Sequence, residues 1–278
     1  MPLSDIQIDV FRLLASHRDP ESYVAGSSPL NVCNPRFSGD IDLFHDREER
    51  VARAYEQDSA LLRAQGFDLQ DLRREPTFYA VLVRRGDEVT KLEWVVDSDF
   101  RFFPTVRDEI FGYVLHPIDL AINKASAAAG RREPRDVVDL VTIHEQVLPL
   151  GAVFLAAAGK FVGFTPEGII NEIKRLARYT RADFQRIASD PPVDPAAIMM
   201  KLRMALDEAE AFVMQMPTDK VGLLFMKGGA IVQPDPERLT DYQTHAGQRR
   251  GQWPSSPEIA SAMFKRYLAG PRVGWDAP

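Results

Sequence analysis

The sequence has one cysteine, Cys33, in 278 residues, which excludes an internal disulfide and a thiolate-based zinc site. It also has no apolar run that approaches the roughly 20 residues needed for a membrane-spanning helix. Residues 1–16 carry Asp5 and Asp9 without a basic segment, which does not fit a signal peptide. Together these absences predict a cytoplasmic protein with no membrane partner.

Basic residues are outnumbered by acidic ones. The chain has 34 Lys and Arg against 40 Asp and Glu, a formal net charge of −6. This charge argues against a surface covered with basic residues for nonspecific binding to double-stranded nucleic acid. One segment is locally basic: at helical spacing Lys174, Arg178 and Arg181 share a face. This pattern predicts either a solvated helix face or a surface for the phosphates of a nucleotide or an RNA.

The pattern of secondary structure divides the chain into three parts. Residues 1–115 mix helix and strand patterns, residues 116–217 are almost wholly helical, and residues 218–278 contain a small hairpin and a wrapping tail. The prediction is therefore an α+β fold, in which a mixed sheet with helices is followed by a mainly helical region.

Two local patterns support strands and helices in the first part. Residues 48–65 are typical of a helix that ends at Gly66, a residue suited to the left-handed conformation. Residues 78–83 and 89–96 are rich in β-branched and aromatic residues and flank a turn, which predicts a hairpin.

A glycine turn follows the short apolar run at residues 23–25. Gly26 would let the backbone approach a phosphate, and the N–H groups that open the next helix would attract it. Ser28 and Pro29 are suited to the N-cap and first position of that helix.

Asp40 and Asp42 flank Ile41 on the next predicted strand. Alternate side chains of a strand share a face, so the two carboxylates point the same way while Ile41 faces the core. Neighbouring carboxylates repel each other unless a cation lies between them, and hard oxygen ligands suit Mg²⁺. The alternatives for this pair are an exposed turn and the Asp-x-Asp motif of sugar transferases.

The order strand, Gly-Ser, twelve residues, Asp-hydrophobic-Asp resembles the signature of the DNA polymerase β-like nucleotidyltransferase superfamily. That resemblance implies a third carboxylate on a later strand. Glu93 fits, because it faces away from Leu92 and Trp94, and Asp97 at the strand end is the rival.

A second group of charged residues follows a predicted helix that Gly130 ends. Lys124 lies on that helix, and lysine is a flexible point charge suited to triphosphate oxygens. Asp136 falls in the first turn of a helix that Pro134 starts, where an acid meets the positive end of the helix dipole. Asp139 lies three positions later on the same face, as a partner for the lysine or for a metal.

With both groups, the sequence is similar to the AbiEii/AbiGii type of nucleotidyltransferase, the toxin half of abortive-infection and toxin–antitoxin pairs. The resemblance covers residues 23–140 and implies the following active-site residues: Gly26, Ser27, Ser38, Asp40, Asp42, Lys124 and Asp136 or Asp139. Of these, Gly26, Ser27, Ser38 and Lys124 would bind the nucleotide, and Asp40, Asp42 and Glu93 would bind the metal.

The resemblance implies transfer of NMP from an NTP with Mg²⁺ as cofactor, with tRNA as candidate acceptor and a cognate antitoxin as candidate partner. Two alternatives stay open: a catalytically degenerate nucleotidyltransferase fold that binds nucleotide or a partner protein, and a helical interaction protein in which Asp40-x-Asp42 is coincidental. His45 and His116 have no partner at metal-ligand spacing, which favours structural or surface roles.

Overall fold

The computed structural model describes residues 3–31 and 36–254. Cys33 and residues 255–278 of the wrapping tail, which the sequence predicts from Gln233 onward, therefore lie outside the described residues. The chain divides into two units. The N-terminal unit comprises Met1–Asp99 and Pro104–His116, and the C-terminal unit comprises Phe100–Phe103 and Pro117–Pro278.

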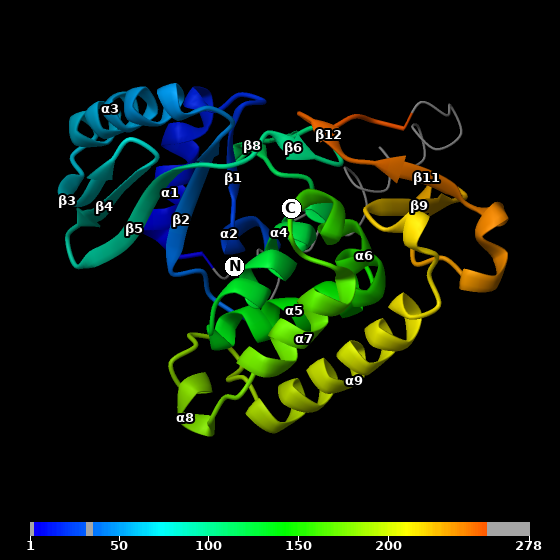
Figure 1. The fold of residues 1–278 in the computed structure, drawn as a ribbon. Coiled ribbons are helices and arrows are strands. Elements are labelled where there is room, and N and C mark those ends of the chain that lie inside the picture. Colours follow the sequence, from blue (N-terminus) through cyan, green and yellow to red (C-terminus); the bar gives the residue numbers. More distant parts are fainter. Residues whose placement is uncertain (1–2, 32–35, 255–278) are drawn as a thin grey trace. The chain divides into compact units, whose positions relative to one another are not determined.

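A seven-stranded mixed sheet forms the N-terminal unit, in the order β3-β4-β5-β2-β1-β8-β7 (Figure 1). Its strands are β1 (Ser22–Ala25), β2 (Asp40–His45), β3 (Asp68–Glu75), β4 (Phe78–Arg85), β5 (Glu88–Val96), β7 (Val106–Asp108) and β8 (Gly112–Val114). Strand β2 pairs antiparallel with β1 and parallel with β5.

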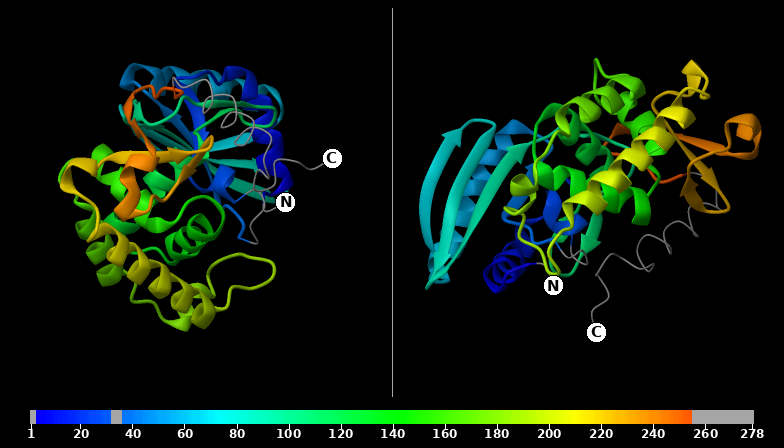
Figure 2. Two further views of the ribbon diagram at one scale, coloured as in Figure 1. Left: turned by 90° about the vertical axis from the view of Figure 1, so that its right-hand side faces the viewer. Right: turned by 90° about the horizontal axis from the view of Figure 1, so that it is seen from below.

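The predicted hairpin is confirmed as β4 and β5, and β3 extends it to three antiparallel strands at one edge of the sheet (cyan in the right view of Figure 2). The turn between β4 and β5 contains Gly86 at φ +59°, a conformation that L side chains rarely adopt.

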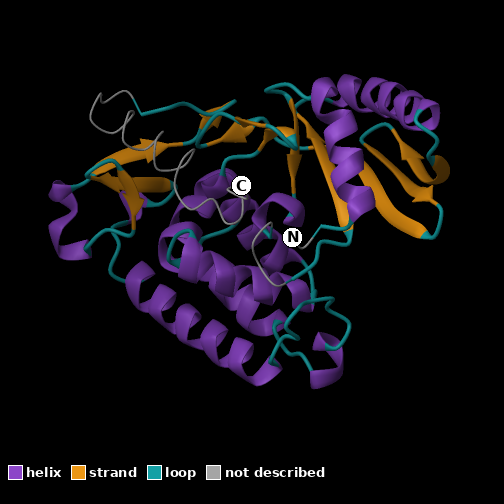
Figure 3. Ribbon diagram, turned by 180° about the vertical axis from the view of Figure 1, so that it is seen from behind, coloured by secondary structure: helices purple, strands orange, loops and turns teal. Residues whose placement is uncertain are grey.

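Helices α1 (Asp5–Leu14) and α3 (Glu48–Ala64) lie side by side on the sheet (Figure 3). The predicted helix before Gly66 is thereby confirmed as α3, and Gly66 has φ +82°. A short 3-10 helix, η1 (Ala15–His17), follows α1.

The carboxylate of Asp58 on α3 is buried at the centre of this packing, with no exposed area. It accepts hydrogen bonds from Arg18 Nη2, at 2.8 and 2.6 Å, and from Trp94 Nε1, at 2.8 Å, and it pairs with His17 Nδ1 at 2.7 Å. A buried charge is stable only when it is paired and hydrogen-bonded, and here the partners come from η1, from the residue after it and from β5.

The C-terminal unit is mainly helical, as predicted (green to yellow in Figure 1). Its helices are α4 (Pro117–Gly130), α5 (Pro134–Gln146), α6 (Leu150–Lys160), α7 (Pro166–Leu176), α8 (Arg181–Phe184) and α9 (Pro195–Val213). Helix α4 also holds the residues that follow strand β6 (Phe100–Arg101), because the buried Asp119 accepts the backbone N–H groups of Phe102 and Phe103 at 2.8 and 3.0 Å. Burial raises the pKa of Asp119 to about 6, although these two hydrogen bonds act in the opposite direction.

The predicted hairpin near the C-terminus is confirmed as β9 (Leu223–Lys227) and β10 (Ala230–Val232). Strand β11 (Gln243–Ala246) pairs with the other side of β9, and β12 (Gln248–Arg249) pairs with β6. The 3-10 helices η2 (Thr218–Lys220) and η3 (Pro236–Asp241) complete this region.

The prediction of a basic helix face is wrong. Helix α7 ends at Leu176, and the side chain of Thr180 starts the separate helix α8 through a capping box with Asp183. The two helices therefore do not share a face. Lys174 is also neutralised, because its Nζ lies 2.8 Å from Glu210 and 3.4 Å from Asp207 on α9.

Within residues 3–31 and 36–254, no single helix is both long and apolar enough to cross a bilayer. The pair α5 and α6 passes that test only when taken together, and the two helices are bent by 114° at their junction.

Candidate active site

The predicted catalytic aspartates lie on β2, between β1 and β5. Ile41 and Leu43 are buried, whereas Asp40 and Asp42 are half-buried on the other side of the strand, as the alternation predicts. The antiparallel register places Ala25 beside Asp42, and the parallel register places Glu93 beside Asp42. Asp42 is thereby set next to the turn that follows Ala25, with Glu93 on its other side.

The turn itself depends on glycine. Gly26 has φ +72° and ψ −145°, and a Cβ atom at this position would lie 2.0 Å from Asp42 Oδ2. The Asp42 carboxylate therefore lies against the backbone of the turn, in space that any other residue would fill. Gly26 is also the N-cap of α2 (Ser27–Leu30), so the prediction of Ser28 as N-cap is wrong.

Two serines hold the start of β2. The hydroxyl groups of Ser28 and Ser38 lie 2.9 Å apart, and each donates to the carbonyl oxygen of Asp40, at 2.9 and 3.0 Å. Gln7 supports the pair by donating to the carbonyl oxygen of Ser38. Ser28 does not cap α2 because its hydroxyl is used here. Ser27 is half-buried on the first turn of α2.

Lys91 is a member of the site that sequence reasoning missed. Its Nζ lies 2.9 Å from Glu93 Oε1 and 3.4 Å from Asp40 Oδ2. Partial burial lowers the pKa of Lys91, but the carboxylates of Glu93 and Asp40 outweigh that effect and raise it above its usual value. The signal in the sequence is the spacing of Lys91 and Glu93, two residues apart on one strand face.

Glu93 and Asp97 were the two candidates for the third carboxylate, and they lie at different places in the structure. Asp97 lies beyond the end of β5, where its backbone N–H donates to the carbonyl oxygen of His45 at 3.0 Å. That place is at the far end of β2 from Asp40. Glu93, in contrast, lies in register with Asp42.

The three carboxylates fit a divalent cation by their chemistry. Within the described ranges, no group of three His, Cys, Asp or Glu side chains is already arranged to hold a metal ion. The Lys91 ammonium group, however, lies between Asp40 and Glu93, in the position that a metal ion would occupy. Carboxylate oxygens are the ligands that Mg²⁺ prefers, so Asp40, Asp42 and Glu93 are of the chemical type that this ion requires.

The second predicted group comes together in the C-terminal unit. Lys124 Nζ on α4 lies 3.0 Å from Asp136 Oδ1 and 2.9 Å from Asp139 Oδ2, both on α5. Only 6% of the Lys124 side chain is exposed, and both aspartates are buried. Arg131 makes two further hydrogen bonds to Asp136. Burial would raise the pKa of Asp136, but Lys124 and Arg131 outweigh it and hold that pKa below its usual value.

Comparison with known structures identifies the fold. The chain is similar to MenT4, a nucleotidyltransferase toxin from Mycobacterium tuberculosis H37Rv, with 19% identity and a TM-score of 0.55 over 77% of this chain and 84% of that one. A Cid1 poly(U) polymerase structure has 14% identity and a TM-score of 0.28 over 60% of this chain and 49% of that one. No protein-family model and no curated protein matches the sequence.

The predicted fold class is confirmed: the chain has the nucleotidyltransferase fold, an α+β core followed by a mainly helical region. The resemblance that the motifs indicated is thereby confirmed at the level of the fold.

The contact between Asp42 and Gly26 predicts an unequal response to two alanine substitutions. We expect Gly26→Ala and Gly66→Ala each to lose about 1–2 kcal/mol of unfolding free energy, because both glycines have positive φ. Gly26→Ala should lose about 1–3 kcal/mol more, because its methyl group must displace Asp42, whereas Gly66 faces open space. Urea denaturation measures both. Equal losses would show that Asp42 is not held against the turn.

Proposed function

We propose that this chain is a Mg²⁺-dependent nucleotidyltransferase that moves NMP from an NTP to an acceptor. One observation carries the proposal. Asp42 lies against the Gly26 turn and in register with Glu93, with Asp40 two residues away, in a chain that has the nucleotidyltransferase fold. Transfer at a triphosphate depends mainly on positioning and on charge neutralisation, and clustered carboxylates are how a protein holds the ions that neutralise it.

In this proposal Asp40, Asp42 and Glu93 hold Mg²⁺. The bound ion would stabilise charge on the attacking and leaving oxygens of the transferred group. Ser38 positions Asp40 through the hydrogen bond to its carbonyl oxygen. Ser27 would contact the nucleotide beside the turn. The small size of Gly26 keeps the metal-binding carboxylate of Asp42 close to the backbone.

Lys124, with Asp136 and Asp139, is proposed as the phosphate-binding group. Two of the three N–H groups of its ammonium are directed at the two aspartates, which hold the side chain in one orientation. The third N–H is then the group that would meet an oxygen of the triphosphate. Asp139 acts in this proposal by orienting the lysine.

The name of MenT4 describes a nucleotidyltransferase toxin, and we propose the same biological role for this chain, with a cognate antitoxin as partner. The proposed acceptor is tRNA. The basic helix face that supported RNA binding is absent, so this part of the proposal depends on the family resemblance. Incubating the protein with a labelled NTP and either tRNA or total protein tests the acceptor, because the label will mark one or the other.

One observation favours the alternative, a degenerate fold that binds nucleotide or a partner protein without catalysis. Lys91 already occupies the place of a cation between Asp40 and Glu93. In an enzyme this ammonium must give way to Mg²⁺, whereas in a degenerate module it would replace the metal permanently.

The carboxylates provide the first test of catalysis. We expect Asp40→Asn and Asp42→Asn each to reduce nucleotidyl transfer by about two orders of magnitude or more, because each removes a negatively charged metal ligand. Transfer is measured as incorporation of labelled NMP. Asp97→Asn is the matched control, because Asp97 lies at the other end of β2 and its loss should leave transfer unchanged. Normal transfer in both Asp40→Asn and Asp42→Asn would refute the metal site.

Lys91 distinguishes the enzyme from the degenerate module. We expect Lys91→Ala to bind Mg²⁺ about tenfold more tightly than wild type, because the competing ammonium is gone. Isothermal calorimetry measures this affinity. Lys227→Ala, which removes a lysine from an ion pair with Asp241 in the C-terminal unit, is the control and should have no effect. If neither wild type nor Lys91→Ala binds Mg²⁺, the degenerate module is the correct description.

Lys124 requires measurements of stability and of binding together. We expect Lys124→Ala to lose about 3–5 kcal/mol of unfolding free energy, because the buried Asp136 and Asp139 would both lose the ammonium group that pairs with them. Lys124→Arg keeps the charge and should recover most of the stability. It should bind NTP more weakly than wild type, because a guanidinium differs in shape from an ammonium. If Lys124→Arg has the stability and the NTP affinity of wild type, Lys124 has a structural role only.

A further inference from the structure

A cavity of about 630 Å³ lies in the N-terminal unit at the His45 end of β2. Residues of η1, the loop before β1, β1, β2 and the first half of α3 surround it. Its lining consists of His17, Arg18, Asp19, Ser22, His45, Arg47, Glu49, Arg50, Arg53, Ala54 and Gln57. None of the carboxylates of the candidate active site belongs to this lining. We call this cavity the Arg18 pocket.

Three lining residues carry buried polar atoms that lack a hydrogen-bond partner among residues 3–31 and 36–254. These atoms are Nε and Nη1 of Arg18, Oγ of Ser22 and both ring nitrogens of His45. The three side chains belong to one place, because Ser22 and His45 are paired residues of β1 and β2. An unpaired buried polar group costs about 1–3 kcal/mol, so a ligand that makes hydrogen bonds to these five atoms would recover much of that cost on binding.

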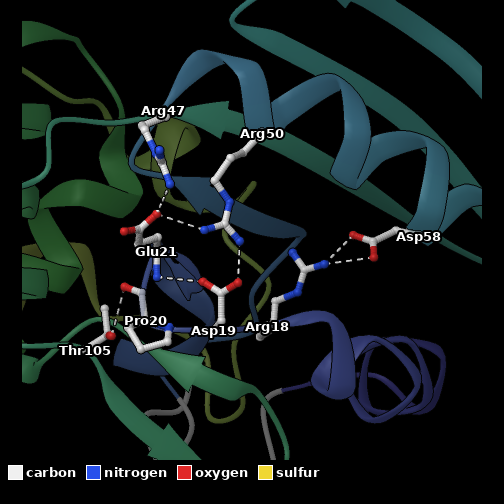
Figure 4. Close-up of polar contacts among 8 residues, drawn as sticks. All are labelled: Arg18, Asp19, Pro20, Glu21, Arg47, Arg50, Asp58 and Thr105. Carbon is white, nitrogen blue, oxygen red and sulfur yellow. Dashed lines mark hydrogen bonds and ion pairs between the residues drawn. The ribbon is translucent and has the colours of Figure 1, made fainter.

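The carboxylate of Asp58 sets the orientation of the Arg18 guanidinium group. Asp58 binds only its Nη2, which leaves Nε and Nη1 available (Figure 4). Arg50 pairs with Asp19 and Glu21, and Arg47 pairs with Glu21, as Figure 4 shows. Arg47 and Arg50 also line the pocket, so these pairs hold two more guanidinium groups in place there.

The chemistry of the unpaired atoms defines the ligand. Both free Arg18 nitrogens are donors only, so the ligand must present acceptor oxygens to them. Burial, and then the charge of Arg18, lowers the pKa of His45 to about 3, so its neutral ring offers one donor at physiological pH. The donors come from side chains on three segments. A tetrahedral phosphate presents oxygens in several directions, whereas a carboxylate presents two in one plane.

The size of the pocket adds to this argument. A volume of about 630 Å³ falls within the range of small-molecule sites, roughly 300–1,000 Å³, and exceeds what one phosphate group fills. We propose that the Arg18 pocket binds the phosphate group of a small phosphorylated molecule, with Arg18, Ser22 and His45 as its direct ligands. This site is separate from the carboxylates of Asp40 and Asp42, and it does not depend on nucleotidyl transfer.

Ser22→Ala is the variant that tests the proposal. Arg18 cannot be used alone, because its loss would leave the buried Asp58 without its charge partner. The Ser22 hydroxyl makes no hydrogen bond within the described chain, so its removal should not lower stability. Ser59→Ala is the matched control: its hydroxyl is also buried and without a partner in the described residues, but Ser59 does not line the pocket.

The measurement follows the His45 ring signals by NMR in the full chain without Mg²⁺, titrated with inorganic phosphate and, separately, with adenosine 5′-monophosphate. We expect both probes to shift these signals in wild type and in Ser59→Ala. Ser22→Ala should bind about tenfold more weakly, the effect of one hydrogen bond to a charged group. If adenosine 5′-monophosphate binds more tightly than inorganic phosphate, the ligand is a phosphate ester. If the two probes bind with equal affinity, the ligand is free phosphate.

Two results would overturn the proposal. The first is a His45 ring whose signals respond to neither probe beyond the effect of sodium chloride at equal ionic strength. The second is equal affinity in Ser22→Ala and wild type, which would show that phosphate binds elsewhere on the chain.

Discussion

Strand β2 has neighbours of opposite direction, β1 antiparallel and β5 parallel, and the candidate active site depends on the register of these two pairings. The first pairing places the Gly26 turn beside Asp42, and the second places Glu93 beside the same residue. A shift of one residue in either pairing would turn a carboxylate into the core, because side chains alternate across a strand. The size of Gly26 and the charge of Lys91 matter only because this register brings them to Asp40 and Asp42.

Buried charges organise both units, and each is held by several partners. Asp58 joins η1, α3 and β5 in the N-terminal unit, and Lys124 joins α4 to α5 in the C-terminal unit. A charge in a low-dielectric interior is stable only with such partners, and therefore each network also fixes the orientation of a side chain. Asp58 fixes Arg18 so that its remaining donors face the Arg18 pocket. In the same way, Asp136 and Asp139 fix the ammonium of Lys124.

The incorrect and missing predictions share a physical cause. The basic face through Lys174, Arg178 and Arg181 assumed one continuous helix, but the capping box of Thr180 and Asp183 begins a new one. Lys91 was missed because its partner Asp40 lies on another strand, so only strand pairing brings them together. His45 was interpreted as structural or surface. The structure shows it buried, next to an arginine that lies 27 positions earlier in the chain.

The sequence by itself determined the local chemistry: the glycine turn, the Asp40 and Asp42 pair on one strand face, the helix before Gly66 and the hairpin of β4 and β5. These features follow from periods of 2 and 3.6 residues and from turn residues, which act over a few positions. Tertiary structure alone decided that Glu93 rather than Asp97 lies beside Asp42, that Lys91 bridges Asp40 and Glu93, and that Arg18, Ser22 and His45 line one pocket. The reason is that strand register and the pairing of buried charges are set by burial across the whole unit, between residues far apart in the chain.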